Sequence, residues 1–313
     1  MRVLAVDVGG SHAVCALVED RAVRSSRRLD LDRAQGLGAA LPLLEGAFRE
    51  LLEEAQLDSR ACAGLAFSFC GLVDTDRNRI LSTNQKYDDG PGLDLPGWCR
   101  RAFDVPLKLE NDARMALLGE RHAGAALGFD DVVMITLGTG IGGAAMIGGR
   151  LLHGKHYQAG CLGGHLPIRM GGRTCTCGNI GCVEAEAATW SLPQICREWP
   201  GFEASALAAE SQLDFATLAA HARHGDRVAC QVLDHSLRVW STGAVALVHA
   251  YDPEVLVLGG GIMQSADMIL PFIQQYVSQY AWTPWGKVQV RAAVLGNEAA
   301  LVGAVPLIAG GAA

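Results

Sequence analysis

Three cysteines in one short stretch, CTCGNIGC, are the densest group of reactive side chains in the sequence. Cys175, Cys177 and Cys182 come shortly after Gly164-His165 and directly before Val183-Glu184. Thiols at this spacing can form a disulfide, a redox site or a metal site, and they can also be small core residues. The local pattern alone leaves these four possibilities open.

Glycine-rich turns form a second set of candidates, because consecutive glycines after a strand expose backbone N–H groups that bind phosphate oxygens. An ordinary tight turn is the alternative for any one of them. Three such turns in one chain, each after an apolar run, favour phosphate binding. None is a GxxxxGK[ST] loop or a GxGxxG that opens a helix, which argues against a dinucleotide enzyme. The turns are Gly9-Gly10-Ser11, Gly138-Thr139-Gly140 and Gly259-Gly260-Gly261.

Two carboxylates accompany these turns. Asp7 lies in the first apolar run, immediately before the first turn. A carboxylate beside a bound phosphate requires a cation such as Mg²⁺ between them, and a turn-capping role is the alternative. Asn111 and Asp112 open a segment of helical pattern, NDARMALLGERHAGAA, and on that pattern alone they predict a helix N-cap.

The elements that must position these residues alternate between strand and helix. Residues 3–18 and 131–152 each predict a strand, a turn in which glycine supplies φ > 0, and a returning strand. This repetition suggests two related halves. Residues 39–56 have helical periodicity, and residues 63–74 predict a buried strand that ends in a loop.

The second half of the sequence predicts more helix. Residues 184–250 are mostly helical in pattern, residues 251–263 predict a buried strand, a triple glycine and a helix start, and residues 298–308 predict an apolar helix. Alternating strands and helices indicate the α/β class.

Composition narrows the range of functions. The 313 residues include 33 acidic and 26 basic side chains, a net charge of −7, with no Lys/Arg-rich run, so nucleic acid is not expected as a partner. No signal peptide or membrane span is predicted, and we expect a cytoplasmic protein. The cysteines outside CTCGNIGC are scattered singly, and Cys15, Cys62 and Cys230 are expected to be small core residues.

Several segments, taken together, resemble the ROK family of sugar kinases (repressors, open reading frames, kinases), and within it the glucokinase, N-acylhexosamine kinase and fructokinase-like group. The resemblance runs from the first strand to near the C-terminus. The segments are AVDVGGSHAVCALV, LENDARMALLGE, ITLGTGIGGA, GHLPI with RTCTCGNIGCVEA, and DPEVLVLGGGI.

The resemblance implies a two-domain ribonuclease-H-like fold (the actin/hexokinase/Hsp70 ATPase fold) that closes over sugar and ATP, usually in a homodimer. We expect a small N-terminal domain at residues 1–118, completed by a C-terminal helix at 298–313, and a large domain at 119–297 with a zinc loop at 165–184. Many family members act as repressors through an N-terminal helix-turn-helix. This sequence begins at the strand that leads into the first glycine turn, so a kinase is expected.

Within this resemblance the spacing of CTCGNIGC favours zinc. One imidazole and three thiolates form a recognised structural Zn²⁺ set, and the CxC pair is too close for a comfortable disulfide. Gly178 and Gly181 would permit the tight loop. A metal with four protein ligands has no coordination position left for a substrate, so its role should be structural rather than catalytic. The expected ligands are His165, Cys175, Cys177 and Cys182.

The resemblance also implies the chemistry: ATP- and Mg²⁺-dependent transfer of the γ-phosphate to the 6-hydroxyl of a hexose such as glucose, or of a hexosamine. It gives Asp112 as general base, Asn111 as the residue that orients the sugar, and Glu184 as a sugar ligand. The second ring nitrogen of His165 is expected to face a sugar hydroxyl. Asn84 in LSTNQKYDD is a weaker candidate for sugar contact. Asp7 and the three glycine turns are expected to bind the nucleotide phosphates and Mg²⁺.

One departure from the family pattern concerns the sugar. ROK kinases carry Ala-Gly-Glu-x-Gly-His, whereas this chain reads AGCLGGH from Ala159 to His165, with Cys161 or Leu162 in the place of the glutamate. Losing a charge-assisted hydrogen bond costs about 1.5–3 kcal/mol. This leaves three possibilities open for the site: a sugar altered at that end, weak sugar binding, or a rearranged pocket. The alternative function is a catalytically weak or inactive sugar-binding sensor of the same fold.

Overall fold

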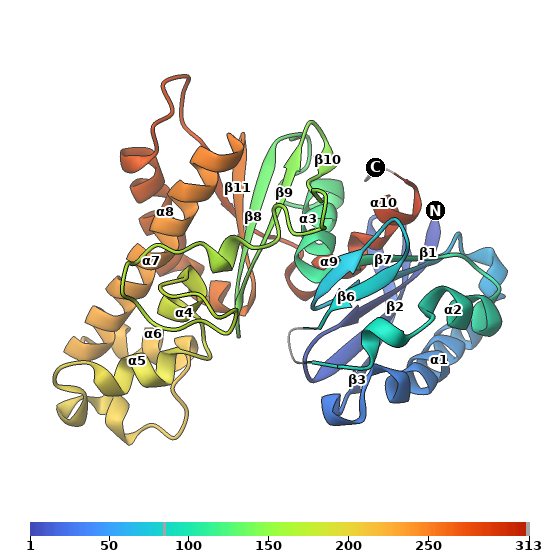
Figure 1. The fold of residues 1–313 in the computed structure, drawn as a ribbon, viewed down its shortest axis with the longest axis horizontal. Coiled ribbons are helices and arrows are strands. Elements are labelled where there is room, and N and C mark those ends of the chain that lie inside the picture. Colours follow the sequence, from blue (N-terminus) through green and yellow to red (C-terminus); the bar gives the residue numbers. More distant parts are fainter. Residues whose placement is uncertain (84–85, 311–313) are drawn as a thin grey trace. The chain divides into compact units, whose positions relative to one another are not determined.

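The computed structural model describes residues 1–83 and 86–310, which form two compact units. Unit 1 comprises residues 1–128, 148–161 and the segment from Asn297 onward, and unit 2 comprises residues 129–147 and 162–296. The boundary expected after residue 118 falls inside helix α3 (Asp112–Ala123), all of which belongs to unit 1. Figure 1 shows the C-terminal helices next to the N-terminal sheet.

A five-stranded mixed sheet forms the centre of unit 1, in the order β3-β2-β1-β4-β7. The first three strands are antiparallel neighbours, whereas β4 lies parallel to β1 and β7 lies parallel to β4. A further small sheet pairs β5 (Leu72–Asp74) with β6 (Arg79–Ser82). The strands of the large sheet are β1 (Arg2–Val8), β2 (His12–Glu19), β3 (Ala22–Asp30), β4 (Leu65–Phe69) and β7 (Leu107–Asn111).

A second sheet repeats this plan in the order β10-β9-β8-β11-β12. Its central pair β8–β9 is antiparallel, and β11 lies parallel to both β8 and β12. The repeated hairpin of the sequence therefore does mark two halves with the same strand order. The strands are β8 (Val132–Leu137), β9 (Ile141–Ile147), β10 (Arg150–Leu151), β11 (Val255–Gly259) and β12 (Gln289–Ala292).

The side chains of β1 alternate between the two faces of the sheet, and helices cover both faces. Leu4, Val6 and Val8 point to one face and pack in one core cluster with α1 (Leu37–Glu54) and α2 (Leu95–Phe103). Because side chains alternate along a strand, Asp7 points to the opposite face, where α3 and the C-terminal helices contact the sheet.

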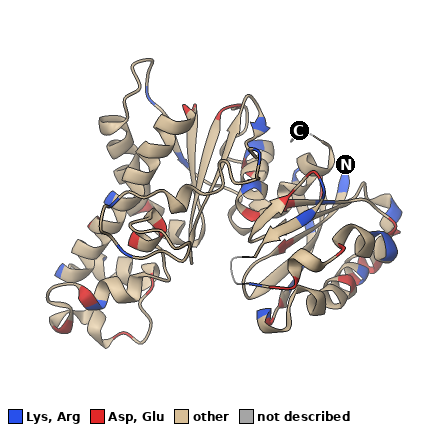
Figure 2. Cartoon of the chain, in the orientation of Figure 1, with Lys and Arg blue, Asp and Glu red and all other residues tan. Residues whose placement is uncertain are grey.

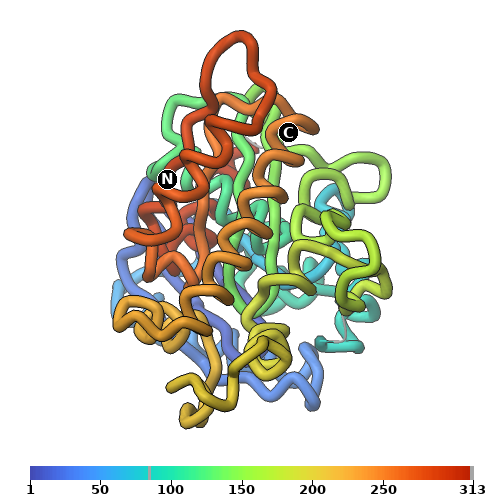
Figure 3. Tube along the Cα trace, turned by 90° about the vertical axis from the view of Figure 1, so that its left-hand side faces the viewer, coloured from blue at the N-terminus to red at the C-terminus, as the bar shows by residue number. Residues whose placement is uncertain are grey.

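Unit 2 contains more helix than strand. The longest, α7, contacts β8, and α8 contacts β12, so the mostly helical pattern predicted after Glu184 is confirmed. Figures 1 and 3 both show a loop between α8 and β12 that projects from the unit, and it carries Trp282 and Trp285, which are 80% and 56% exposed. The helices are α4 (Val183–Ala187), α5 (Leu192–Glu198), α6 (Phe215–Arg223), α7 (Arg227–Tyr251) and α8 (Ala266–Tyr280).

Two local expectations are corrected. The single C-terminal helix is two short ones, α9 (Ala299–Val302) and α10 (Ala304–Ile308), separated by Gly303. A Cβ on Gly303 would lie 2.1 Å from the carbonyl oxygen of Met115, so close contact with α3 explains the glycine. Cys15 and Cys62 are buried as expected, but Cys230 is exposed.

The α/β class with two ribonuclease-H-like halves is confirmed by this strand order.

Acidic and basic residues lie on the same elements (Figure 2), for example on α1, where Arg49 and Glu45 form an ion pair at 2.7 Å. Within the described residues, no helix has both the length and the apolar composition to cross a membrane.

Candidate functional site

Asp112 is the first residue of α3 and follows the end of β7. The side chain of Asn111 caps this helix by accepting the N–H groups of Ala113 and Arg114, as the sequence pattern predicts. Asn111 Nδ2 and the backbone N–H of Ala113 both donate to Asp112 Oδ1 at 2.8 Å. No donor within the described part of the chain reaches Oδ2, so one oxygen is fixed and the other is left to accept a proton.

The electrostatic surroundings of Asp112 suit a base that works near neutral pH. Burial, followed by the negative charge of Asp7, raises the pKa of Asp112 to about 6, against the opposing effects of the Ala113 N–H, Lys86 and Asn111. A carboxylate with this pKa is largely ionised above pH 6 and can still hold a proton transiently.

Asp7 and the first glycine turn lie in the same unit. Ser68, the partner of Asp7 in the parallel β1–β4 register, donates its hydroxyl to Asp7 Oδ1 at 2.5 Å. Burial raises the pKa of Asp7, and the Ser68 hydrogen bond partly offsets this. Ser68 is the only donor to Asp7 among residues 1–83 and 86–310, which leaves carboxylate oxygen for a hard cation.

The backbone of this turn has free donors. Gly9 donates its N–H to the carbonyl of His12 at 2.9 Å, but the N–H groups of Gly10 and Ser11 have no acceptor among the described residues. Free adjacent amides of this kind suit a phosphate oxygen. The free amides of this turn therefore support the phosphate-binding interpretation.

Positive φ does not explain the glycines of the first two turns. Among the described glycines with positive φ are Gly178, Gly181 and Gly260, but not Gly9, Gly10, Gly138 or Gly140. Close approach is the reason at Gly140, where a Cβ would lie 2.6 Å from Glu184 Oε2. The expectation that glycine supplies φ > 0 in both hairpin turns was wrong for these positions.

Glu184 of α4 joins three parts of unit 2. Its Oε2 accepts the N–H of Ile141, directly after the second glycine turn, at 2.8 Å. Its Oε1 accepts the hydroxyl of Thr176 at 3.2 Å and the indole N–H of Trp190 at 3.3 Å. The N–H of Trp190 in turn donates to the carbonyl of Thr139 at 3.2 Å. This buried carboxylate thus fixes the Gly138-Thr139-Gly140 turn to the cysteine loop.

The third turn ends β11 and opens a short 3-10 helix, Gly261–Ser265, before α8. Gly260 has φ +91°, and a Cβ there would lie 2.2 Å from the carbonyl oxygen of Leu137. Only glycine satisfies both conditions. Gly259 and Gly261 complete the turn as the sequence predicted.

The structure brings together all four expected metal ligands. The ligand atoms of His165, Cys175, Cys177 and Cys182 all lie within 4.8 Å of one another. The sulfurs of Cys177 and Cys182 are 3.8 Å apart, and Cys175 Sγ is 3.5 Å from His165 Nδ1. Four ligands at Zn–S distances of about 2.3 Å in a tetrahedron are separated by roughly 3.8 Å. The cluster is therefore a possible Zn²⁺ site, and His165 Nε2 is the ring nitrogen left for another partner.

Gly181 explains how this loop closes. Its φ is +74°, and a Cβ would lie 1.8 Å from the carbonyl oxygen of Arg169. Gly178 also has positive φ. Cys182 is the N-cap of α4, so the loop leads directly into the helix that carries Glu184.

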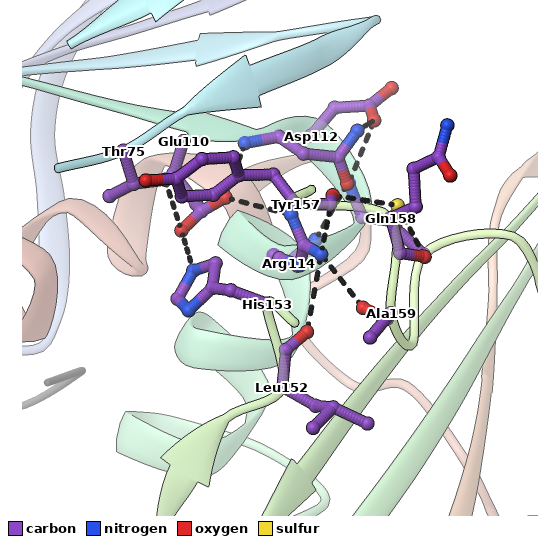
Figure 4. A network of polar contacts seen from close by, with 12 residues as sticks. Thr75, Glu110, Asp112, Arg114, Leu152, His153, Tyr157, Gln158 and Ala159 are labelled. Carbon is purple, nitrogen blue, oxygen red and sulfur yellow. Dashed lines mark hydrogen bonds and ion pairs between the residues drawn. The ribbon is translucent and has the colours of Figure 1, made fainter. Parts of the chain in front are cut away.

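A buried network holds the segment with the altered sugar motif (Figure 4). Arg114 is fully buried, and its Nη2 donates to the carbonyls of Leu152, Tyr157 and Ala159 at 3.2, 2.9 and 2.8 Å. Its Nη1 lies 3.5 Å from Glu110. One side chain of α3 therefore fixes the backbone that leads to Cys161.

Glu110 receives further donors in this network. His153 Nε2 lies 2.7 Å from Glu110 Oε2, and the Thr75 hydroxyl donates to the same oxygen at 3.0 Å. Cys161 directs its thiol to the carbonyls of Tyr157 and Gln158 at 3.6 and 3.4 Å, and Leu162 is 42% exposed. Neither residue supplies the missing carboxylate.

Sequence reasoning missed several of these residues. Thr176 lies between two expected metal ligands, and this position could have identified it as a site residue. Trp190, Lys86 and Arg114 had no such signal, because their contacts join distant segments. Asn84, the weaker sugar candidate, lies outside the described residues.

Comparisons with known proteins agree with this arrangement. The sequence matches the ROK family over residues 3–310. A glucokinase of Halalkalibacterium halodurans is 34% identical over 247 residues, which are 77% of this chain and 74% of that protein. A ROK hexokinase from Thermus thermophilus superposes with TM-score 0.80 at 29% identity, covering 98% of this chain and 97% of the other.

A second solved structure is a ROK family glucokinase from Streptomyces griseus in complex with glucose and AMPPNP. It superposes with TM-score 0.81 at 27% identity and covers 98% of this chain and 99% of its own. The match over nearly the whole sequence, together with these structural likenesses, shows that the chain belongs to the ROK family.

Proposed function

We propose that the protein is an ATP-dependent sugar kinase that transfers the γ-phosphate to the 6-hydroxyl of a hexose, with Asp112 as general base. The observation that carries the proposal is the geometry of Asp112: Oδ1 is fixed by two donors, Oδ2 is open, and the pKa is about 6. A general base is most effective when its pKa is close to the working pH. The glucokinases and the hexokinase among the relatives support the same reaction.

In the proposed step the sugar hydroxyl oxygen attacks the γ-phosphorus and the bond from that phosphorus to the leaving ADP oxygen breaks. The hydroxyl proton passes to Asp112 Oδ2. Asn111 keeps Asp112 in place, because its Nδ2 donates both to Asp112 and to the carbonyl of Gly71 at 3.0 Å. Its role in orienting the sugar stays a prediction.

The donor phosphates are assigned to the glycine turns. In unit 1 the free N–H groups of Gly10 and Ser11 would bind phosphate oxygens, and Asp7 would hold Mg²⁺ or its water shell. In unit 2 the turns at 138–140 and 259–261 would contact the nucleotide. Bound Mg²⁺ supplies positive charge that neutralises the phosphates.

The cysteine cluster is assigned to structural Zn²⁺, whose role would be to fix the loop that ends at Glu184. Glu184 and His165 Nε2 are the proposed sugar ligands from this unit. Because Thr176 and Trp190 already occupy Glu184 Oε1, its Oε2 is the oxygen with room for a sugar hydroxyl.

The sugar is proposed to be a hexose or hexosamine that does not depend on a carboxylate at the position of Cys161 and Leu162. A coupled kinase assay of the zinc-loaded protein with ATP should detect turnover of glucose, mannose, allose, fructose or their N-acetylated or deoxy relatives. Absence of transfer to every sugar, with ATP, GTP or polyphosphate as donor, would reject the kinase. The homodimer implied by the family is tested separately by light scattering.

A second candidate is a sugar-binding sensor, favoured by the lack of a carboxylate at Cys161 and Leu162. Calorimetry separates the two. A sensor binds a sugar that it does not phosphorylate, whereas the kinase turns over the sugar that it binds.

A further inference from the structure

Lys86 and Tyr87 dock on the first glycine turn of unit 1. Tyr87 is 1% exposed, and its hydroxyl donates to the carbonyl of Gly9 at 2.9 Å. The side chain of Lys86 lies across Gly10: its Cε and Nζ are 3.5 and 3.7 Å from the point that a Cβ of Gly10 would occupy. The buried tyrosine therefore anchors the neighbour of Lys86 to the turn, and the lysine side chain lies across Gly10, one of the two residues with a free N–H.

The charges around Lys86 leave it available to an anion. No carboxylate of the described residues forms an ion pair with it within 4.0 Å, although its charge acts on Asp112 and on Cys70. Lys86 also lines a pocket of about 510 Å³ together with Arg33, Asp88 and Asp89.

The two acidic residues of this pocket are already engaged. Asp89 accepts the N–H groups of Leu37 and Gly38 at 2.7 Å each, and Asp88 accepts the hydroxyl of Thr83 at 3.2 Å. The first glycine turn thus brings together two free amides and an ammonium group without an ion pair among the described residues, and the charge of that ammonium acts on Asp112.

We propose that Lys86 binds the terminal phosphoryl group of the phosphate donor at the Gly9-Gly10-Ser11 turn. The ligand class is the end of a polyphosphate chain, carried either by a nucleoside triphosphate or by inorganic polyphosphate. The role of Lys86 is to supply positive charge, which counters the negative charge of the transferred group. The catalytic part of this inference rests on the proposed kinase activity, whereas the binding part does not.

The binding part is tested by calorimetry with two probes, AMPPNP and tripolyphosphate, at constant Mg²⁺. Lys86→Met should weaken binding of at least one probe tenfold or more, and the affected probe identifies the donor class. Lys86→Arg should stay within about threefold of the wild type. Lys108→Met, which removes the same charge from the exposed side of β7, should bind like the wild type. Equal affinities of Lys86→Met and wild-type protein for both probes would overturn the proposal.

The catalytic part is tested with the sugar that the wild type phosphorylates. Lys86→Met should lower kcat at least tenfold and move the acidic limb of the pH profile of kcat/KM to higher pH, because Lys86 lowers the pKa of Asp112. A normal kcat with an unmoved limb would overturn the role of Lys86 and leave the kinase assignment standing. If the wild type phosphorylates nothing, the kinase proposal fails, and the calorimetry still decides whether Lys86 binds phosphate. Lys86→Gln is the second neutral variant should the Met variant not fold.

Discussion

The two units share a strand order but place different groups at the same position of their central strands. In unit 1, Asp7 of β1 lies beside Ser68 of β4, whereas in unit 2 the register pairs Thr136 of β8 with Gly259 of β11. Unit 1 therefore has a carboxylate next to its glycine turn, and unit 2 has a hydroxyl and bare backbone. The same topology thus places a carboxylate on the central strand of one unit and a hydroxyl on the central strand of the other, where the carboxylate at the glycine turn comes instead from Glu184 of α4.

The segments that follow the strands extend this difference. In unit 1 the residue after β7 is Asp112, and in unit 2 the residue after β12 is Ala293. Unit 2 instead carries the cysteine loop, which is tied to its glycine turn by Glu184. The proposed function accordingly places proton transfer in unit 1 and the proposed structural zinc in unit 2.

The largest expected effect comes from removing the carboxylate of Asp112, the proposed base of unit 1. Asp112→Asn should lower kcat by about 10²- to 10⁴-fold, the range of general-base catalysis, measured in the coupled assay. The variant should unfold at an equal or higher temperature, because the ionised Asp112 is disfavoured by burial and by Asp7. Asp104→Asn, on the exposed end of α2, is the control with the same charge change. Full activity of Asp112→Asn would contradict the assignment of the base.

The second largest effect is expected from removing one of the proposed metal ligands of unit 2. Cys177 is exposed, so Cys177→Ala leaves little cavity, yet it removes one of four ligands. The zinc content by elemental analysis should fall from about one per chain to well below one, with a lower midpoint of thermal unfolding. Cys230→Ala, the other exposed cysteine of unit 2, should keep its zinc. A zinc content unchanged in Cys177→Ala would exclude the four-ligand site.

A smaller effect is expected on stability, where loss of the buried network of Figure 4 should cost more unfolding free energy than loss of an exposed ion pair. Arg114→Met removes the buried cation beside Glu110 and the donor to the carbonyls of Leu152, Tyr157 and Ala159, and should lower the free energy of unfolding by about 3–5 kcal/mol. Arg49→Met, which breaks the exposed pair with Glu45, should cost about 0–1 kcal/mol. Urea denaturation of both variants measures this. Equal effects would show that the network does not stabilise unit 1.

Much of this arrangement could be predicted from the sequence because it depends on local patterns. The hairpins, α1 and the Asn111 N-cap follow from periodicity and capping chemistry. The metal cluster follows from a spacing within one loop, with His165 close before it. The α/β class follows from the order of these elements.

The remaining features depend on contacts between distant segments. Glu184 lies too close to Gly140, and Met115 too close to Gly303, for a larger side chain at either position. No local sequence pattern predicts these contacts. Lys86 reaches the turn at Gly10, and Trp190 reaches Glu184, only after the chain has folded. The raised pKa of Asp112 likewise depends on burial and on Asp7, a residue more than a hundred positions away.

The pH dependence of kcat/KM tests the role of Asp112 most directly. The base must be ionised to accept the sugar proton, and its pKa is about 6. Activity should therefore be full above pH 7 and should fall about tenfold per pH unit below pH 6. A profile that stays flat down to pH 4.5, near the pKa of an ordinary carboxyl group, would contradict the assignment of Asp112 as the base.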